Sequence, residues 1–203
     1  MRVIGITGGI GSGKSQVLSY LEMEYHAKVR QLDVIAKELQ KHGTVCYQEI
    51  VHAFGCDILL ESGALDRQKL AEMIFSSSRK RQLLNAIVHP HVKEWIRHDI
   101  YLEKKKNTFL YAIEAALLIE DNYKEICDEI WYIFSEKSVR MMRLEKSRGY
   151  TKDKIIQIMD SQLSEMKFRE NADVVIDNNG DFRSTMQQVN GIVDSYAQRI
   201  IFH

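Results

Sequence analysis

Proline, cysteine and long apolar stretches are scarce in this sequence. Among 203 residues there is one proline, Pro90, and there are three cysteines, an odd number without metal-ligand spacing. Reduced thiols in a cytoplasmic protein are the simplest interpretation. No apolar run approaches the roughly 20 residues that span a bilayer, and Arg2 is followed by too short an apolar run for a signal peptide. We therefore expect a soluble protein of the cytoplasm.

An excess of charge of one sign is also lacking. The 28 basic and 28 acidic residues cancel, so nothing global favours nucleic acid or an anionic membrane as a partner, and we expect neither. We expect a monomer or a small homo-oligomer. Apolar residues make up 45% and charged residues 28%, and the chain is long enough to bury a sizeable core.

Short apolar runs alternate with longer helical stretches, which predicts an α/β fold with a parallel sheet flanked by helices. The apolar spacing after the first glycines predicts a helix over 14–25. A second helix is predicted from Asp33 toward Gly43, and a last one over 181–199. Five strands are predicted, at 2–6, 28–32, within 108–117, at 129–134 and at 173–178.

Two helical excursions interrupt this core. The roughly 75 residues between the second and third strands exceed what a crossover needs, and they contain helical patterns at 67–75 and 79–106, the latter broken near Pro90. A helical pair is predicted at 138–147 and 151–170. We assign a nucleotide-binding core to 1–40 and 107–203, containing a lid at 138–170, and a helical insertion to 41–106.

The segment "GGIGSGKS", Gly8–Ser15, is named here the phosphate loop. It matches G-x-x-x-x-G-K-[ST] between a predicted strand and a predicted helix. Its glycines allow backbone N–H groups to converge on phosphate oxygens at a helix N-terminus. Lys14 is expected to reach the β- and γ-phosphates, and Ser15 to offer its hydroxyl to Mg²⁺. The motif identifies a nucleotide, but not a reaction.

A GTPase shares this loop but needs guanine signatures as well. "DNNG", Asp177–Gly180, satisfies D-x-x-G, yet no N-K-x-D occurs in the chain. We interpret it as a turn at a strand end. A small-molecule kinase instead needs a group that orients the acceptor hydroxyl, cations for the transition state and a lid against water.

Asp33 is the first candidate for orienting an acceptor, because it follows the second predicted strand at the sheet edge where ligands bind. The same position also suits a helix N-cap. The candidate cations lie in the segment from Glu136 to Lys154, which contains seven basic residues and three acidic ones. A solvated basic surface is the alternative to a lid that delivers arginines to the phosphates. The basic residues are Lys137, Arg140, Arg143, Lys146, Arg148, Lys152 and Lys154.

With these residues in place, the chain resembles the dephospho-CoA kinase family nearly from end to end. The resemblance is carried by an ordered set of segments rather than by the phosphate loop alone. It implies a P-loop NTPase fold with a helical substrate-binding insertion and a helical lid. The segments are "GITGGIGSGKS", "LDVIAKEL", "ALDRQKLAEMIF", "LLNAIVHPHV", "ALLIE", the basic lid and "NADVVIDNNG".

The resemblance implies ATP-dependent phosphorylation, with Mg²⁺, of the ribose 3′-hydroxyl of dephospho-CoA. It makes Asp33 the catalytic carboxylate, with Lys14 and Arg143 completing the catalytic set. It places the acceptor against the insertion near "LLNAIVHP", where Asn85 and His89 share a helix face. A capping or packing role is the alternative for His89. The expected ATP-binding residues are Gly8, Gly11, Ser12, Gly13, Lys14, Ser15, Gln16, Arg143 and Arg148.

The chain departs from the family pattern in three places. Gln31 stands where the family has the first Asp of an Asp-x-Asp pair, which leaves Asp33 alone. Ala116 replaces a proline, and we expect a local backbone change there rather than lost activity. In the lid, Ser147 occupies the usual arginine position and Arg148 the following Asp position. Whether Arg148 serves in place of that arginine is an open question at this stage.

Two other functions remain as alternatives. A nucleoside monophosphate kinase would need arginines lining the insertion, and Arg67, Arg79, Arg81 and Arg97 keep that possibility open. A non-catalytic ATP-binding regulator would bind nucleotide without acceptor-dependent turnover.

Overall fold

The computed structural model describes residues 1–115 and 117–201, with side chains up to Tyr196. Ala116, where a backbone change was expected, lies outside the described residues. The chain divides into two compact units, one formed by Met1–Arg30 and Asn107–His203 and the other by Gln31–Lys106. This boundary falls before the second helix, whereas the sequence-based assignment kept residues up to 40 with the core. The assignment of nucleotide binding to the core and of acceptor binding to the insertion stays a prediction.

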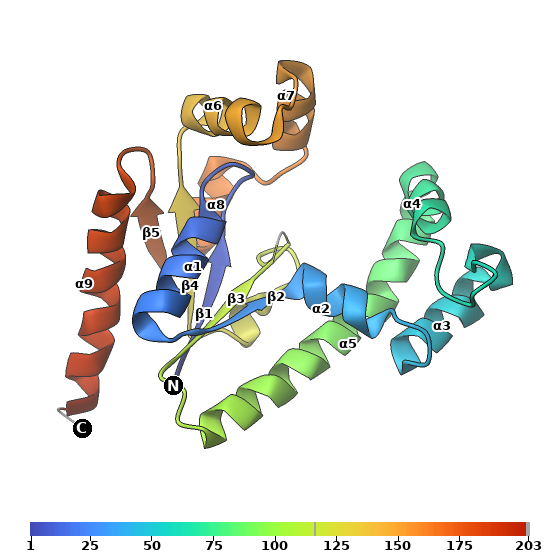
Figure 1. Cartoon of the computed structure of the whole chain (residues 1–203), viewed down its shortest axis with the longest axis horizontal. Helices are drawn as coiled ribbons and strands as arrows, with labels where there is room; N and C mark the ends of the chain where they lie inside the picture. Colours follow the sequence, from blue (N-terminus) through green and yellow to red (C-terminus); the bar gives the residue numbers. More distant parts are fainter. Residues whose placement is uncertain (116, 202–203) are drawn as a thin grey trace. The chain divides into compact units, whose positions relative to one another are not determined.

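The first unit contains a five-stranded sheet in the order β2-β3-β1-β4-β5 (Figure 1). β1 lies at the centre and pairs in parallel with β3 and β4, and β4 pairs in parallel with β5. The predicted α/β fold with five strands is confirmed. The strands are β1 (Arg2–Thr7), β2 (Lys28–Gln31), β3 (Leu110–Glu114), β4 (Glu129–Phe134) and β5 (Val174–Asp177).

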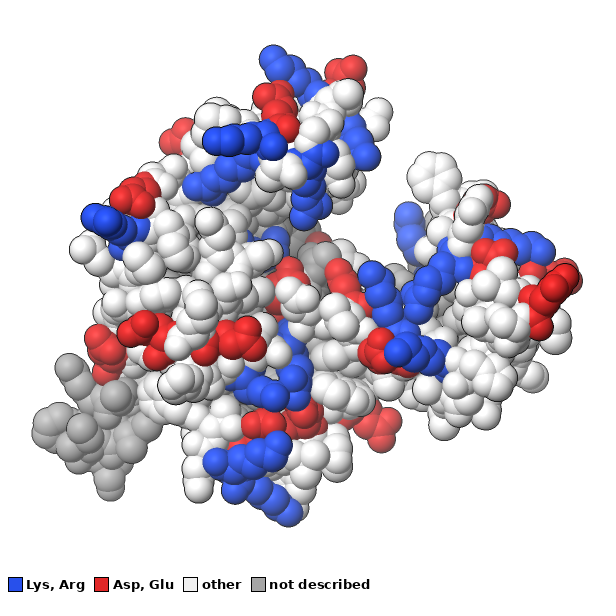
Figure 2. Space-filling model, viewed as in Figure 1, with Lys and Arg blue, Asp and Glu red and all other residues white. Residues whose placement is uncertain are grey.

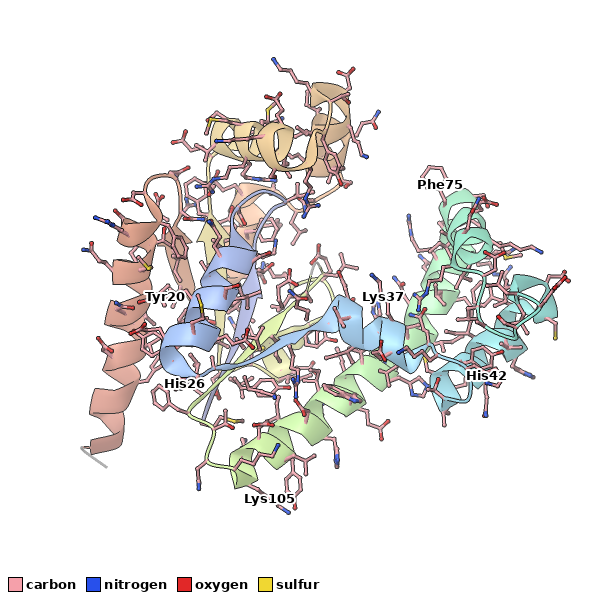
Figure 3. All side chains as sticks on the ribbon, in the orientation of Figure 1. Tyr20, His26, Lys37, His42, Phe75 and Lys105 are labelled. Carbon is pink, nitrogen blue, oxygen red and sulfur yellow. The ribbon has the colours of Figure 1, made fainter. Side chains whose placement is uncertain are left out.

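The main apolar core of this unit joins the sheet to α1 (Lys14–Tyr25) and α9 (Phe182–Ile201). Ile4 and Trp131 of the sheet are fully buried against Leu21 of α1 and Val189 of α9. Tyr20, labelled in Figure 3, donates to Asn190 Oδ1 of α9 at 2.6 Å. These contacts fix α1, which follows the phosphate loop, on the sheet.

The remaining helices of the first unit follow β4. The lid, residues 138–170, was predicted as two helices but forms three, because a turn at 161–164 ends one helix and Ser164 caps the next by accepting from Lys167 N. Phe168 of the third helix stacks on Tyr132 with ring centroids 4.9 Å apart. These helices are α6 (Lys137–Arg148), α7 (Lys152–Asp160) and α8 (Glu165–Asn171); a short 3₁₀ turn, η2 (Tyr123–Glu125), precedes β4.

The second unit is helical, and α2, α3 and α4 each pack on the long helix α5 (Ser78–Lys105). The predicted break near Pro90 is wrong, because α5 continues through it. A row of buried residues at a spacing of four, from Leu84 to Ile100, packs along the helix on both sides of the proline and compensates for the lost N–H donor. The other elements are α2 (Leu32–Leu39), α3 (Val45–Phe54), η1 (Cys56–Ile58) and α4 (Arg67–Ser76).

Candidate active site

The phosphate loop connects the C-terminal end of the central strand β1 to the N-terminus of α1. The strand order reverses about β1, and ligands bind at the carboxyl edge of such sheets at this point. The strand, loop and helix expected around the motif are therefore all present. Gly13 precedes α1 and supplies no side-chain cap, so the amides of the first turn face the loop's ligand without a competing side-chain acceptor.

A cavity of about 720 Å³ opens beside this loop within the first unit. Its size suits a nucleotide-sized ligand. Seven of the nine predicted ATP-binding residues line it, and Gly8 and Ser12 of the phosphate loop are not among the lining residues; the seven are Gly11, Gly13, Lys14, Ser15, Gln16, Arg143 and Arg148. The lining residues that the sequence analysis did not assign to the nucleotide are Ile10 of the loop itself and, from other elements, Glu114, Leu144, Lys146 and Ser147.

The charged residues that line this cavity are mainly cationic. Lys14 lies at the base of the loop, where its Nζ donates to Gly8 O at 2.8 Å. Lys146 and Arg148 add positive charge from α6, and the Arg148 guanidinium lies 5.9 Å from the ring centre of Tyr150. Figure 2 shows Lys and Arg side chains gathered over α6 and α7. This distribution of charge suits a polyphosphate.

Arg143 is anchored under the phosphate loop rather than extended from the lid. Its Nη1 donates to Ser135 Oγ at 3.1 Å and to Ser12 O at 3.4 Å, and its Nη2 donates to Asn178 O at 2.7 Å. The side chain is half-buried and still lines the cavity. It therefore holds the loop's backbone while keeping its charge beside the nucleotide position.

Asn178, directly after β5, completes this anchor. It is 1% exposed, and its Nδ2 donates to Ser12 O at 2.8 Å while its Oδ1 accepts from Thr185 Oγ1 at 2.8 Å. A Cβ at Gly13, which has φ 92°, would lie 2.1 Å from Asn178 Nδ2. A side chain at position 13 would therefore strain the backbone and displace the amide that holds the loop.

Ser12 itself is 1% exposed, and its hydroxyl has no hydrogen-bond partner in the part of the chain that the structure describes. A buried hydroxyl of this kind costs free energy unless it is bonded. Its position in the phosphate loop suits donation to an anionic oxygen. The "DNNG" segment nearby forms the predicted turn at the end of β5, where Asp177 Oδ1 accepts from Asn179 N at 2.8 Å.

The predicted acceptor residues lie in the second unit. α2 has Gln31 as its N-cap without a side-chain cap, and Asp33 lies exposed in the first turn. The N-cap role considered for Asp33 is therefore wrong, and its carboxylate faces solvent. Asn85 and His89 are both half-buried and lie one turn apart on α5, which the structure keeps continuous.

Glu114 is the main cavity residue that the sequence reasoning missed. It ends β3 at the carboxyl edge of the sheet, next to Ile6 of β1 in the parallel register. The signal was available, because a charged residue directly follows a buried apolar run in "LYAIE". Its carboxylate is the acidic group among lining residues that include the basic side chains of Lys14, Arg143, Lys146 and Arg148.

No helix within 1–115 and 117–201 has the length and apolar character to cross a membrane.

A family model described as dephospho-CoA kinase matches residues 2–184. Dephospho-CoA kinase from Bacillus licheniformis is 34% identical over 96% of this chain and 96% of its own length, and that from Streptococcus mutans is 36% identical over 98% of each.

The solved structure of dephospho-CoA kinase from Campylobacter jejuni has the same fold, with a TM-score of 0.69 and 20% identity over 96% of this chain and 99% of that one. The phosphate loop and its cationic cavity, on this fold, agree with the match along nearly the whole sequence. The chain belongs to the dephospho-CoA kinase family.

Proposed function

We propose that this protein transfers the γ-phosphoryl group of ATP to the ribose 3′-hydroxyl of dephospho-CoA, with Mg²⁺, and so forms coenzyme A. Membership of the family supports the reaction, and the cationic cavity beside the phosphate loop supports the donor side. The cavity is the observation that carries the proposal, because its lysine, loop amides and arginines are the groups that phosphoryl transfer requires.

In this mechanism the chain contributes positioning and charge. The loop amides and Lys14 hold the phosphates, and Arg143 and Arg148 offset the negative charge that spreads over the transferred group. The carbonyl of Ser12 accepts from Arg143 and Asn178 and so anchors the loop. A loose transition state of this kind needs fixed geometry more than a strong base.

The residues present suit a magnesium ion that is shared with the nucleotide. Within the described residues no group of three His, Cys, Asp or Glu side chains forms a metal site. Ser15 and Glu114 line the same cavity, and Mg²⁺ binds through one or two protein oxygens together with substrate phosphates. When bound, the ion neutralises phosphate charge. Ser15 and Glu114 would hold it.

On the acceptor side, Asp33 accepts a hydrogen bond from the 3′-hydroxyl and takes its proton late in the transfer. Its exposed position and the lack of a capping contact leave the carboxylate available for this role. Asn85 and His89 give the acceptor polar contacts from one face of α5. Gln31 in place of a second carboxylate makes Asp33 the only base that we assign.

A panel of acceptors tests the proposal against its alternatives. Purified protein, ATP and Mg²⁺ are combined with dephospho-CoA, AMP, CMP or shikimate, and ADP release is measured. We expect stimulation by dephospho-CoA alone. Stimulation by AMP without any by dephospho-CoA would indicate a nucleoside monophosphate kinase, and no stimulation by any acceptor would indicate an ATP-binding regulator.

We further infer that the protein works in the cytoplasm. Cys46, Cys56 and Cys127 are all free thiols, and Cys46 and Cys127 are buried. Burial raises the pKa of the Cys127 thiol to about 12, so this thiol stays protonated and unreactive at neutral pH. Free thiols are typical of a reducing compartment.

A further inference from the structure

Ile10, in the middle of the phosphate loop, is held by side chains from two parts of the lid. Its N–H donates to Gln162 Oε1 at 3.0 Å, and its C=O accepts from Arg140 Nε at 2.8 Å. Arg140 Nη2 also donates to Gln162 Oε1 at 3.0 Å. The three hydrogen bonds form a closed ring, so each side chain orients the other as well as the loop. We name this arrangement the Ile10 ring.

The phosphate loop is shaped to receive the Arg140 guanidinium. A Cβ on Gly9 would lie 2.3 Å from Arg140 Cζ, so only glycine leaves room for the side chain at that point. Arg140 is half-buried, and this burial lowers the pKa of its guanidinium. Both acceptors that it bonds are neutral, and its positive charge therefore stays beside the loop.

The side chain of Ile10 strengthens the same connection through apolar contact. It packs against a cluster in which Leu144 of α6 and Ile155 and Met159 of α7 are buried. Gln162 lies in the turn between α7 and α8. The peptide groups and the side chain of this one loop residue are thus tied to α6, to α7 and to the turn that follows.

Arg140 differs from the other arginines of α6 in where it acts. Arg143 and Arg148 line the cavity beside the phosphate loop, whereas Arg140 does not. It reaches the loop from outside, over Gly9 and Ile10. An effect of Arg140 on the nucleotide must therefore pass through the shape and the electric field of the loop.

We propose that Arg140 and Gln162 are positioning residues that hold the phosphate loop in its ATP-binding shape and couple it to the lid. This inference rests on the proposed function, since it concerns the ATP site of the kinase. The ring is complete only when the turn after α7 and the helix α6 are both docked on the loop. Binding of ATP and docking of the lid therefore favour each other.

The test compares Arg140→Ala, Gln162→Ala and the double variant with Lys167→Gln as the control. Lys167 is exposed on α8, where it pairs with Glu170. The dissociation constant for ATP is measured by calorimetry without acceptor, and KM and kcat are measured with dephospho-CoA. Each single variant should raise both the dissociation constant and the KM for ATP by about tenfold. The KM for the acceptor and the kcat at saturating ATP should change little.

Either change opens the same ring. The double variant should therefore have the same affinity for ATP as the single variant that binds ATP less tightly. Arg140→Lys keeps the charge but lacks the fork that reaches both acceptors, so it should recover part of the affinity that Arg140→Ala loses. A melting scan measures the structural effect of each change.

The proposal would be overturned by unchanged ATP affinity in both single variants, by additive losses in the double variant, or by an equal loss in Lys167→Gln. A lower melting temperature without weaker ATP binding would also overturn it, since the residues would then serve stability alone. Failure of the proposed function has a different signature. In that case the native protein binds ATP, and the variants weaken this binding, but dephospho-CoA gives no turnover.

Discussion

At the scale of single residues, the position of the phosphate loop was easier to predict from the sequence than the side chains that hold the loop in place. A glycine-rich loop of fixed spacing works through its backbone, so the sequence motif alone located Gly8–Ser15 correctly between strand and helix. Arg140 and Gln162 meet the loop from positions 130 and 152 residues away from Ile10. Such contacts follow from helix packing, which residue spacing does not encode.

For Asp33 the sequence left two roles open, helix N-cap and catalytic base, and the structure excludes the N-cap role. The sequence allowed either a helix cap or a base, and α2 begins with Gln31 as its N-cap and without a side-chain cap. An acidic residue in the first turn of a helix still gains from the helix dipole. That contribution is modest at an exposed position, so Asp33→Asn should fold normally.

We therefore expect Asp33→Asn to bind ATP as tightly as the native protein and to lose turnover by a factor on the order of 10² to 10⁴. Calorimetry measures the binding, and ADP release with dephospho-CoA measures the rate. Asp57→Asn is the matched control, because Asp57 is also exposed in the first turn of a short helix of the second unit. A near-native rate in Asp33→Asn would remove it from the catalytic set.

At the scale of elements, the strands were predicted well because buried parallel strands are short apolar runs with clear ends. Errors arose within helices, where tertiary packing decides continuity. Pro90 removes one donor and was expected to break its helix, yet the buried row from Leu84 to Ile100 keeps α5 whole. Conversely, the predicted helix 151–170 is interrupted at 161–164, where Gln162 bonds the phosphate loop.

Glu129 connects three elements of the first unit. Its carboxylate, at the start of β4, accepts hydrogen bonds from Arg2 of β1, from Trp131 Nε1 at 3.2 Å and from Tyr196 of α9. Burial by itself would raise the pKa of Glu129, but these hydrogen bonds together hold it below the ordinary value. The ionised carboxylate is thus the form that the folded state favours.

This environment predicts how stability depends on pH. The pKa of Glu129 is lower in the folded protein than in the unfolded chain. The stabilisation of the folded state by the ionised Glu129 carboxylate is therefore fully present above about pH 4.3, and it is lost as the pH falls through the folded pKa. Glu129→Gln should lower the free energy of unfolding at pH 7 by about 1–3 kcal/mol. Urea unfolding at pH 7 and pH 3 measures this, with a smaller difference expected at pH 3. An equal difference at both pH values would contradict the assignment.

At the scale of the whole molecule, the chain consists of a nucleotide-binding unit and a helical unit that carry different parts of the proposed reaction. The first unit contains the phosphate loop, its cationic cavity and the lid. The second contains Asp33, Asn85 and His89. Sequence motifs assigned both sets, and the structure brings most of the nucleotide set together in one cavity of the first unit.

The central claim is that the acceptor is the ribose 3′-hydroxyl of dephospho-CoA. The most direct measurement compares ADP release with dephospho-CoA and with its 3′-deoxy analogue, and it identifies the product by mass spectrometry and by co-elution with coenzyme A. We predict a product identical to coenzyme A from dephospho-CoA and no acceptor-dependent ADP release from the analogue. Equal turnover of the analogue, or a phosphorylated product that separates from coenzyme A, would contradict the account.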